Sequence, residues 1–470
     1  MPNKAEFLQA LQGLLGEAGL LHGGDLSAYE QDWRRRYAGR ALAVARPLNT
    51  SQVAATVKLC AAYGVGLVPQ GGNTGLVGGS TPNASGEQLL LSLLRMKQVR
   101  SVDAANLTMT VDAGCVLQAL QDKAAEHNLL FPLSLGSQGT CTIGGNLASN
   151  AGGTQVLRYG NARELCLGLE VVTAAGEIWN GLSGLRKDNS GYDLRHLFIG
   201  SEGTLGVITA ATLKLYPRPR AQMTALAACD TLEAAVQLLG LAQAQAGASL
   251  TGFEVMNAFS LALVGKHFAQ LPQVLPACPW TVLLELSDAE SEAHARGQFE
   301  SMLEMALTAG LISDAAIAAS HAQSQTMWHL RESIPLAQAQ EGLNIKHDIA
   351  LPVSAIAAFV AATDAALAQA FPGVRLVDFG HLGDGNLHYN VQAPEGVPAK
   401  EFLSRHEAAI NRLVYDAVAA HAGSFSAEHG IGLLKRDELA ARKDPAALQM
   451  MRAIKKALDP QGLMNPGRLL

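Results

Sequence analysis

The chain lacks the features that mark membrane, nucleic-acid-binding or secreted proteins. Only 16% of its 470 residues are charged and its formal net charge is −6, which excludes a basic surface for a nucleic acid. Its six cysteines form no Cys-x-x-Cys pair, which predicts reduced thiols and a cytoplasmic protein. No run of about 18 apolar residues is present, so we expect no membrane span. Residues 1–21 predict an amphipathic helix rather than a secretory signal.

The length of the chain and a proline-rich break near its middle predict two domains. A chain this long exceeds one ordinary hydrophobic core. Its first half alternates strands, helices and glycine-rich loops, and Pro217-Arg218-Pro219 ends that half. We therefore expect one domain over 1–218 and a second over 219–470. In the second, apolar residues at helical spacing predict helices over 231–243, 290–307, 401–421 and 446–458.

Glycines concentrate in three blocks of the first half, at 69–79, 136–153 and 198–209. Glycine lets backbone N–H groups approach a phosphate closely, so three blocks together predict a cradle for a pyrophosphate. Each block alone is equally typical of an ordinary turn. The pattern differs from a Rossmann fingerprint, because no Gly-x-Gly-x-x-Gly opens a helix, and no Gly-Lys-Ser/Thr marks a nucleotide-triphosphate loop.

Segment 375–392 carries the strongest functional signal. Two apolar runs flank Asp384-Gly385, a pair typical of a tight hairpin. Folding about that turn pairs His381 with His388 on one face, and Asn390 follows on the same face. Together with Glu428 further along the chain, the two histidines form the ligand set of an open zinc site. The alternative is a stacked surface pair beside a solvated acid, and a slip of one residue would separate the rings.

The glycine blocks resemble the flavin-binding half of the vanillyl-alcohol oxidase and p-cresol methylhydroxylase family. Segment 458–467 resembles that family's closing segment, so residues from about 455 to 470 are expected to return to the flavin. The resemblance implies an α+β fold, with a two-subdomain FAD-binding domain of the p-cresol methylhydroxylase type. An FAD-linked oxidase C-terminal domain of antiparallel sheet and helices would follow. The residues it implies at FAD are Pro69, Gly71, Gly72, Asn73, Thr74, Gly75, Gly78, Gly136, Thr142, Gly144, Gly145, Asn146, Asn150, Gly152, Gly203, Gly206, Val207, Ile208 and Asn465.

FAD is expected to be held without a covalent bond. Some members of that family attach it through a His or Cys beside the pyrophosphate loop. Residues 70–74 of this chain contain neither. Cys115 and Cys141 are available, but neither lies in a segment that resembles a linkage site.

The second half resembles the D-2-hydroxy-acid dehydrogenase branch of that family. Segments 380–388 and 426–430 match its metal-binding stretches, which implies Zn²⁺ or a similar divalent ion on His381, His388 and Glu428. A histidine titrates near working pH, so His429 is the expected general base, with Asn390 binding the substrate carboxylate. By composition alone Arg331 and Lys346 would be surface charges. The resemblance implies instead that they hold a distal carboxylate of the substrate.

The implied activity is oxidation of a D-2-hydroxy acid to its 2-oxo acid, foremost D-2-hydroxyglutarate to 2-oxoglutarate. Pro335 stands where that branch has a threonine, so D-lactate, D-malate or glycolate remain alternatives. An oxidase of a sugar or phenol is a rival, and so is a non-catalytic flavoprotein subunit. Electron-transfer flavoprotein, a quinone or a cytochrome is the expected acceptor. A homodimer is expected from base rates.

Overall fold

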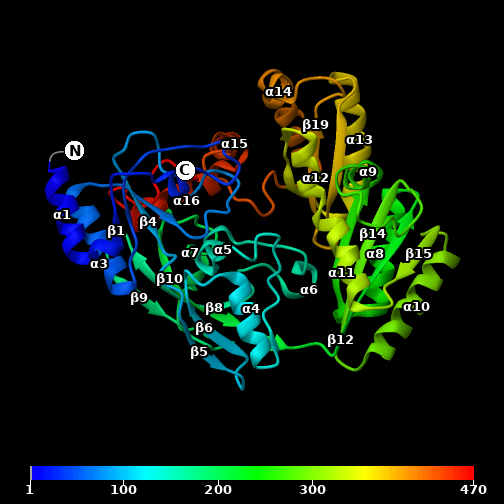
Figure 1. Cartoon of the computed structure of the whole chain (residues 1–470), viewed down its shortest axis with the longest axis horizontal. Helices are drawn as coiled ribbons and strands as arrows, with labels where there is room; N and C mark the ends of the chain where they lie inside the picture. Colours follow the sequence, from blue (N-terminus) through cyan, green and yellow to red (C-terminus); the bar gives the residue numbers. More distant parts are fainter. Residues whose placement is uncertain (1–2) are drawn as a thin grey trace. The chain divides into compact units, whose positions relative to one another are not determined.

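The chain passes more than once between two structural units. In the structure, a computed structural model, residues 3–470 are described (Figure 1). The first unit comprises the chain up to Gly152, then Gly160–Arg218 and Glu428–Leu470. The second comprises Gly153–Tyr159 and Pro219–Ala427. Each unit has its own sheets, so the two are described separately.

A four-stranded sheet of order β1-β2-β4-β3 opens the first unit. Strands β2 and β4 are buried along their whole length and pair in parallel, which explains their continuous apolar sequences. Helix α3 begins at an Asn49 cap, whose side chain accepts from the backbone N–H of Gln52, and ends at Gly64 with φ of 67°. The elements are α1 (Lys4–Leu15), β1 (Leu20–Leu21), α2 (Ser27–Glu30), β2 (Ala41–Ala45), α3 (Thr50–Tyr63), β3 (Leu67–Gln70) and β4 (Gln88–Ser92).

A five-stranded antiparallel sheet of order β5-β6-β10-β8-β9 follows in the same unit. Its central strand β10 is apolar and almost wholly buried, as a strand covered on both faces must be. The elements are β5 (Val99–Asp103), β6 (Thr108–Asp112), α4 (Leu117–Glu126), β7 (Leu129–Leu130), α5 (Ile143–Ser149), β8 (Cys166–Thr173), β9 (Ile178–Gly181), α7 (Arg195–Phe198), β10 (Gly206–Lys214), β11 (Tyr216–Pro217), α15 (Arg436–Arg442) and α16 (Pro445–Leu458).

An eight-stranded sheet of order β15-β12-β14-β13-β18-β19-β16, with β17 beside β19, forms the second unit. All of its pairings are antiparallel. Its strands are β12 (Ala221–Cys229), β13 (Leu250–Asn257), β14 (Trp280–Asp288), β15 (Asp314–Ile317), β16 (Asn344–Ile345), β17 (Asp348–Ala350), β18 (Arg375–His381) and β19 (Asn386–Gln392). Its helices are α6 (Val156–Tyr159), α8 (Leu232–Ala246), α9 (Ala258–His267), α10 (Glu292–Thr308), α11 (His321–Glu332), α12 (Ile334–Glu341), α13 (Ile356–Ala370) and α14 (Ala399–Ala420).

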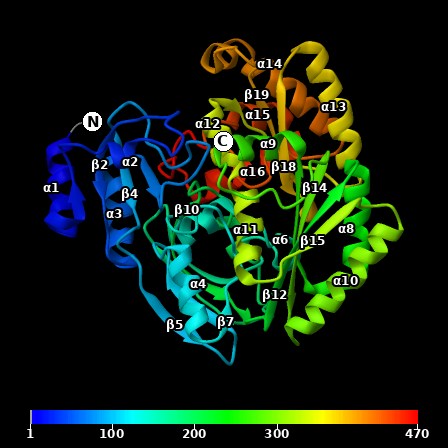
Figure 2. The same cartoon turned by 45° about the vertical axis from the view of Figure 1, so that its right-hand side comes forward.

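The two faces of this sheet are covered by different helices (Figure 2). One face packs against α8, α10, α13 and α14 in the larger apolar core. The other packs against α9, α11 and α12 in a smaller core that includes Val377 and Phe379 of β18. Because side chains alternate along a strand, every second residue of β13, β18 and β19 belongs to this second face. We call it the polar face, because it carries the buried charged residues described below.

One helix of the second unit bears on the expectation of no membrane span. Val353–Ala370, which includes α13, is long and apolar enough to cross a bilayer by length and composition. Within the unit, α13 buries Phe359, Val360 and Leu367 in the larger core. The core helix of a folded domain passes the same test, so this helix alone gives weak support for a span.

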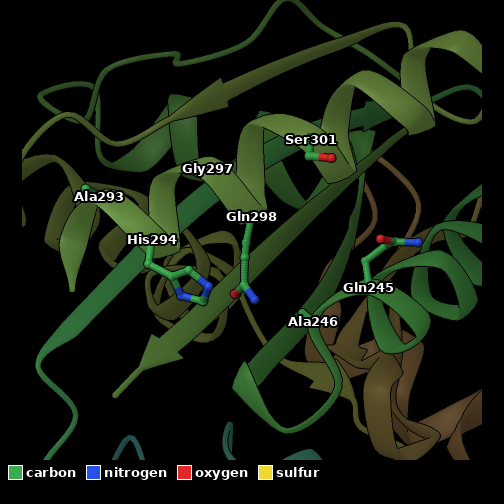
Figure 3. A pocket seen from close by; sticks show the side chains of 7 residues that line it. All are labelled: Gln245, Ala246, Ala293, His294, Gly297, Gln298 and Ser301. Carbon is green, nitrogen blue, oxygen red and sulfur yellow. The ribbon is translucent and has the colours of Figure 1, made fainter. Parts of the chain in front are cut away.

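A hollow of about 450 Å³ lies between α8 and α10 (Figure 3). Its lining includes His294, whose Nδ1 lies 2.7 Å from the carboxylate of Asp288. Both helices cover the larger apolar core. The hollow is therefore on the opposite side of the sheet from the polar face. Its lining residues are Gln245, Ala246, Ala293, His294, Gly297, Gln298 and Ser301.

Asp378 is a buried acid on the apolar side of the same sheet. It pairs across the strands with Tyr389, whose hydroxyl donates to Asp364 at 2.6 Å. Neither carboxyl oxygen of Asp378 has a hydrogen-bond partner among residues 3–470. Burial, together with the neighbouring Asp364 carboxyl, raises the pKa of Asp378 well above its ordinary value. The folded protein therefore holds this side chain protonated at a pH where the unfolded chain ionises it.

Asp378→Asn is expected to stabilise the protein increasingly as pH rises. In the wild type, the raised folded pKa means that stability present below pH ~4 is lost as pH rises toward that pKa, by about 1.4 kcal/mol per pH unit. The neutral amide has no such loss. Denaturant unfolding at pH 5 and pH 8 measures it, with the exposed Asp230→Asn as the control. A difference from the wild type that is equal at both pH values would contradict the prediction.

Candidate functional site

The hairpin of β18 and β19 brings the two predicted histidines together, although in a different register. His381 pairs with Asn386, and His388 pairs with Phe379. The expected pairing of His381 with His388 is therefore wrong by two positions. The turn is wider than Asp384-Gly385 alone, because residues 382–384 form a short 3₁₀ turn before Gly385 at φ of 85°. A slip of two residues preserves the side-chain parity, so both rings still lie on the polar face.

The two imidazoles meet edge to face. Their ring centroids are 5.4 Å apart at an interplanar angle of 80°. The nitrogens that could bind a metal lie within 4.8 Å of one another. His381 is buried and His388 is half-buried. Phe379 packs 4.9 Å from the His388 ring, which restricts the orientation of that ring.

Glu254, which the sequence did not single out, bridges His381 and Arg331 on the polar face. Its Oε1 lies 2.6 Å from His381 Nδ1, and its Oε2 accepts from Arg331 Nε at 2.8 Å and lies 2.7 Å from Nη2. Glu254 is completely buried. Burial alone would raise the pKa of Glu254, but the charges and hydrogen bonds of His381 and Arg331 outweigh burial and lower it. The carboxylate is therefore ionised and acts only as an acceptor.

The three predicted substrate residues all lie in the second unit but differ in their surroundings. Arg331 is 5% exposed and stacks 4.6 Å above the Phe379 ring. Lys346 is half-buried between β16 and β17. Asn390 is buried, and both of its polar atoms bond within the protein, to Gln338 and to the backbone N–H of His347. Composition alone predicted a surface position for Arg331, which is in fact buried. The side chain of Asn390 connects β19 to α12 and to the segment between β16 and β17.

Asp348 is a second acid that the sequence did not single out. It pairs with His388 across β17 and β19, and its Oδ1 lies 4.0 Å from His388 Nδ1. The backbone N–H of Ala427 donates to the carbonyl of Asp348 at 3.2 Å. Glu428 directly follows Ala427 in the chain, and the first unit resumes there with Glu428 and His429.

In the first unit, the glycine blocks are brought against one another. A Cβ on Gly71 would lie 2.3 Å from Thr142 Oγ1, and one on Gly203 would lie 3.0 Å from the Pro69 ring. A Cβ on Gly152 would lie 2.6 Å from a carboxylate oxygen of Glu428. These positions exclude a larger side chain, so the backbone of one segment packs against a side chain of a segment far away in sequence.

Two buried polar atoms in these segments have no hydrogen-bond partner among the described residues. They are Thr142 Oγ1 and Asn465 Oδ1. The Asn465 side chain is fixed through its amide nitrogen, which donates to the carbonyls of Gly79 and Glu202. Orphaned buried polar atoms require an external partner, and a polar cofactor such as FAD supplies one. The residues therefore fit a bound flavin.

The remaining predicted flavin residues are distributed over four segments of the same unit. Gly136 and Gly75 face open space, since a Cβ on either would meet no atom within 4 Å. Asn73 and Asn150 adopt left-handed backbone with φ of 54° and 53°. The four segments are the loop after β3 (Gly71, Gly72, Asn73, Thr74, Gly75, Gly78), the loop that leads into α5 (Gly136), α5 and its flanks (Thr142, Gly144, Gly145, Asn146, Asn150, Gly152), and β10 with its approach (Gly203, Gly206, Val207, Ile208).

Glu202 fixes the loop that follows His429. Its two carboxylate oxygens accept from the backbone N–H groups of Ile431 and Gly432, both at 2.7 Å. Burial raises the pKa of Glu202, although these two hydrogen bonds and Lys435 act in the opposite direction. Glu202 itself has φ of 53°, an unusual conformation for this residue. One side chain from the third glycine block thus anchors the loop that carries Glu428 and His429.

Comparison with known families matches both halves of the chain. Residues 218–469 match the family described as FAD linked oxidases, C-terminal domain. Residues 41–181 match the family described as FAD binding domain.

Curated relatives cover nearly the whole chain. A D-2-hydroxyglutarate dehydrogenase of Xanthomonas citri pv. viticola is 40% identical over 95% of this chain and 92% of that protein. A mitochondrial D-2-hydroxyglutarate dehydrogenase of Bos taurus is 40% identical over 93% of this chain and 78% of that protein. Among solved structures, p-cresol methylhydroxylase with substrate bound has a TM-score of 0.78 at 16% identity, covering 100% of this chain and 97% of that one. That likeness supports the expected α+β fold.

The expectation of a cytoplasmic protein is overturned by these relatives. Those from cattle, rat, zebrafish and Arabidopsis are all named as mitochondrial. Six cysteines without a disulfide are compatible with any reducing compartment, so they cannot distinguish the cytoplasm from the mitochondrion.

Glu202→Gln is expected to loosen the loop at Ile431 and Gly432. An amide offers one oxygen and one NH₂ group, so one of the two backbone N–H groups loses its acceptor, at about 1–2 kcal/mol. Hydrogen exchange of these two amides should accelerate by roughly 5–30-fold. The exposed Glu177→Gln is the control. Unchanged exchange in the Glu202 variant would show that the loop is held by other contacts.

Proposed function

We propose, from the premise that this chain belongs to the FAD-linked oxidases, that it oxidises a D-2-hydroxy acid to the 2-oxo acid. The observation that carries the proposal is the pair of histidines on the polar face, with one ring held by a buried carboxylate that also holds a buried arginine. A metal-ligand pair beside a fixed cation suits a substrate with a hydroxyl group and more than one carboxylate.

When bound, FAD would supply the acceptor for the hydride, which carries both electrons of this oxidation. The chain's contribution is the cradle of glycine segments, in which Thr142 and Asn465 offer unpaired oxygens. Non-covalent attachment is supported by the state of the thiol at Cys115. Burial raises the pKa of Cys115 to about 12, so its sulfur is protonated and a poor nucleophile near neutral pH.

D-2-hydroxyglutarate is the proposed substrate, since relatives at 40% identity over most of the chain are named for it. Arg331 would hold its distal carboxylate with the guanidinium donors that Glu254 does not use, and Lys346 would add a second cation. Asn390 is proposed to shape this region rather than to reach the substrate, because Gln338 and His347 already occupy its polar atoms.

A divalent cation, Zn²⁺ or a similar ion, is proposed on His381, His388 and Glu428. Two imidazoles and one carboxylate leave a coordination position for substrate, and such an ion supplies Lewis acidity toward a bound hydroxyl. His381 and His388 already face one another within the second unit. Glu428 is included because Ala427, the residue before it, is hydrogen-bonded to the strand that pairs with His388.

His429 is proposed to take the proton of the substrate hydroxyl. An imidazole is neutral over part of the working pH range and can accept a proton there. The clamp of Glu202 on Ile431 and Gly432 limits the motion of the loop that presents His429.

D-Lactate is the second candidate. Pro335 lies in the first turn of α12 and has no hydroxyl to offer a second carboxylate, which favours a smaller acid. D-Malate and glycolate belong to the same group. A non-catalytic flavoprotein subunit is a third candidate, and the fixed histidine pair argues against it. The proposed electron acceptor is electron-transfer flavoprotein or a quinone, and a homodimer is the proposed assembly.

Anaerobic mixing of the FAD-loaded protein with D- and L-2-hydroxy acids tests the activity. D-2-Hydroxyglutarate should bleach the visible flavin absorbance, and its L-enantiomer should not. Preference for D-lactate would establish the second candidate. A flavin that no 2-hydroxy acid bleaches, in a protein with full FAD content, would contradict the proposed activity and leave a sugar or phenol oxidase or a non-catalytic subunit.

Removal of metal tests the ligand set. Dialysis against a chelator should lower the rate of flavin reduction by about 10³-fold, because Lewis-acid stabilisation contributes several kcal/mol. Zinc should restore it. His388→Ala should lower the rate as much and should not be restored, while its FAD content stays at the wild-type level. Full activity of a protein without metal by elemental analysis would sink the assignment.

A further inference from the structure

Glu254 is the most completely buried ionised group that the proposed reaction does not use. It lies on β13, in the middle of the eight-stranded sheet, and its side chain is 0% exposed. A carboxylate in such a position is costly unless every lone pair is matched. Its two oxygens divide their contacts: one serves His381, and the other serves Arg331.

The contact with His381 fixes which ring nitrogen carries a proton. Two N–H groups of the Arg331 guanidinium lie 2.8 and 2.7 Å from the other oxygen of Glu254, so this side chain is the carboxylate of an ion pair. A carboxylate only accepts hydrogen bonds, so Nδ1 of His381 donates across the 2.6 Å contact. In the neutral ring, the lone pair then resides on Nε2. This is the nitrogen that an imidazole presents to a metal when a carboxylate holds the other one. A histidine with the opposite tautomer would offer a proton there instead.

Glu254 also orients the guanidinium of Arg331. Arg331 presents Nε and Nη2 to one carboxylate oxygen, and its guanidinium carbon lies over the Phe379 ring, 4.6 Å from the ring centroid. Phe379 is also the neighbour of His388. The guanidinium and both histidines are therefore fixed by a single set of buried contacts within the second unit.

We propose that Glu254 is a positioning residue that sets the tautomer of His381 for metal binding and the orientation of Arg331 for the substrate carboxylate. This inference rests on the proposed function. Glu254 touches neither substrate nor metal, and it acts only through the two residues that it holds.

Glu285 shows that burial alone does not produce this arrangement. It lies on the same face, on the neighbouring strand β14, and accepts from Trp328 at 2.8 Å and from Thr251 at 3.1 Å. Burial raises the pKa of Glu285, and no cation among its contacts compensates. Glu285→Gln is therefore a matched control, because it makes the same chemical change at a buried site without contact to His381.

Zinc affinity is the decisive measurement. Metal-stripped, FAD-loaded wild type, Glu254→Gln and Glu285→Gln are titrated with zinc against a chromophoric chelator. Loss of such a partner weakens metal affinity by about 10–100-fold, and we expect that loss for Glu254→Gln and less than about threefold for Glu285→Gln. Glu254→Gln should also raise the KM for D-2-hydroxyglutarate more than the KM for D-lactate, because Arg331 loses its orientation.

Equal zinc affinity in wild type and Glu254→Gln would overturn the inference while leaving the proposed function intact. A purely structural ion pair predicts that result, with a lower melting temperature as its only effect. A wild type that binds no zinc would overturn the proposed zinc site, on which the inference rests, while flavin bleaching by a D-2-hydroxy acid tests the proposed activity separately. Should Glu254→Gln yield no folded flavoprotein, the double variant E254Q/R331M removes the unpaired cation as well, and its zinc affinity decides the question in the same way.

Discussion

The arrangement of the second unit depends on one buried ion pair. Arg331 and Glu254 are almost fully removed from water, at 6% and 0% side-chain exposure, and either one alone would be strongly destabilising there. The pair is sustainable because the guanidinium uses two nitrogens on one oxygen and His381 uses the other oxygen. Polar groups therefore gather on the face where they can satisfy one another. The opposite face is left to an apolar core that four helices share.

The part of the site that the sequence predicts correctly follows mainly from the alternation of side chains along a strand. The positions of His381 and His388 differ by an odd number, and any hairpin that closes between them with two or four loop residues keeps both on one face. The prediction that both rings lie on one face therefore holds although the predicted turn is wrong. The predicted pairing of residues does not hold. The turn chemistry of Asp384-Gly385 indicated a two-residue loop, but the 3₁₀ turn over 382–384 lengthens it by two residues, both on its N-terminal side.

Contacts over long sequence distances escaped prediction. Glu254 reaches His381 across 127 positions, and Glu202 reaches Ile431 across 229. No periodicity or spacing connects such pairs. The only local signal for Glu254 is an acid inside an otherwise uncharged strand, Leu250–Asn257, and Glu285 shows that this signal does not predict a role. The burial of Arg331 likewise depended on a partner that composition could not identify.

Three buried acids on this one sheet illustrate how partners decide the state of a carboxyl. The pKa of Glu254 is lowered because a guanidinium and an imidazole outweigh burial. The pKa of Glu285 is raised because the hydrogen bonds from the Trp328 indole and the Thr251 hydroxyl do not outweigh burial. Asp378 has no hydrogen-bond partner among residues 3–470 and another carboxyl beside it, so its pKa is raised well above the ordinary value. Of the three, only Glu254 has a lowered pKa, and it is the one beside the histidine. The metal site that we propose on His381 would need a fixed proton acceptor at the other ring nitrogen, and Glu254 provides that acceptor.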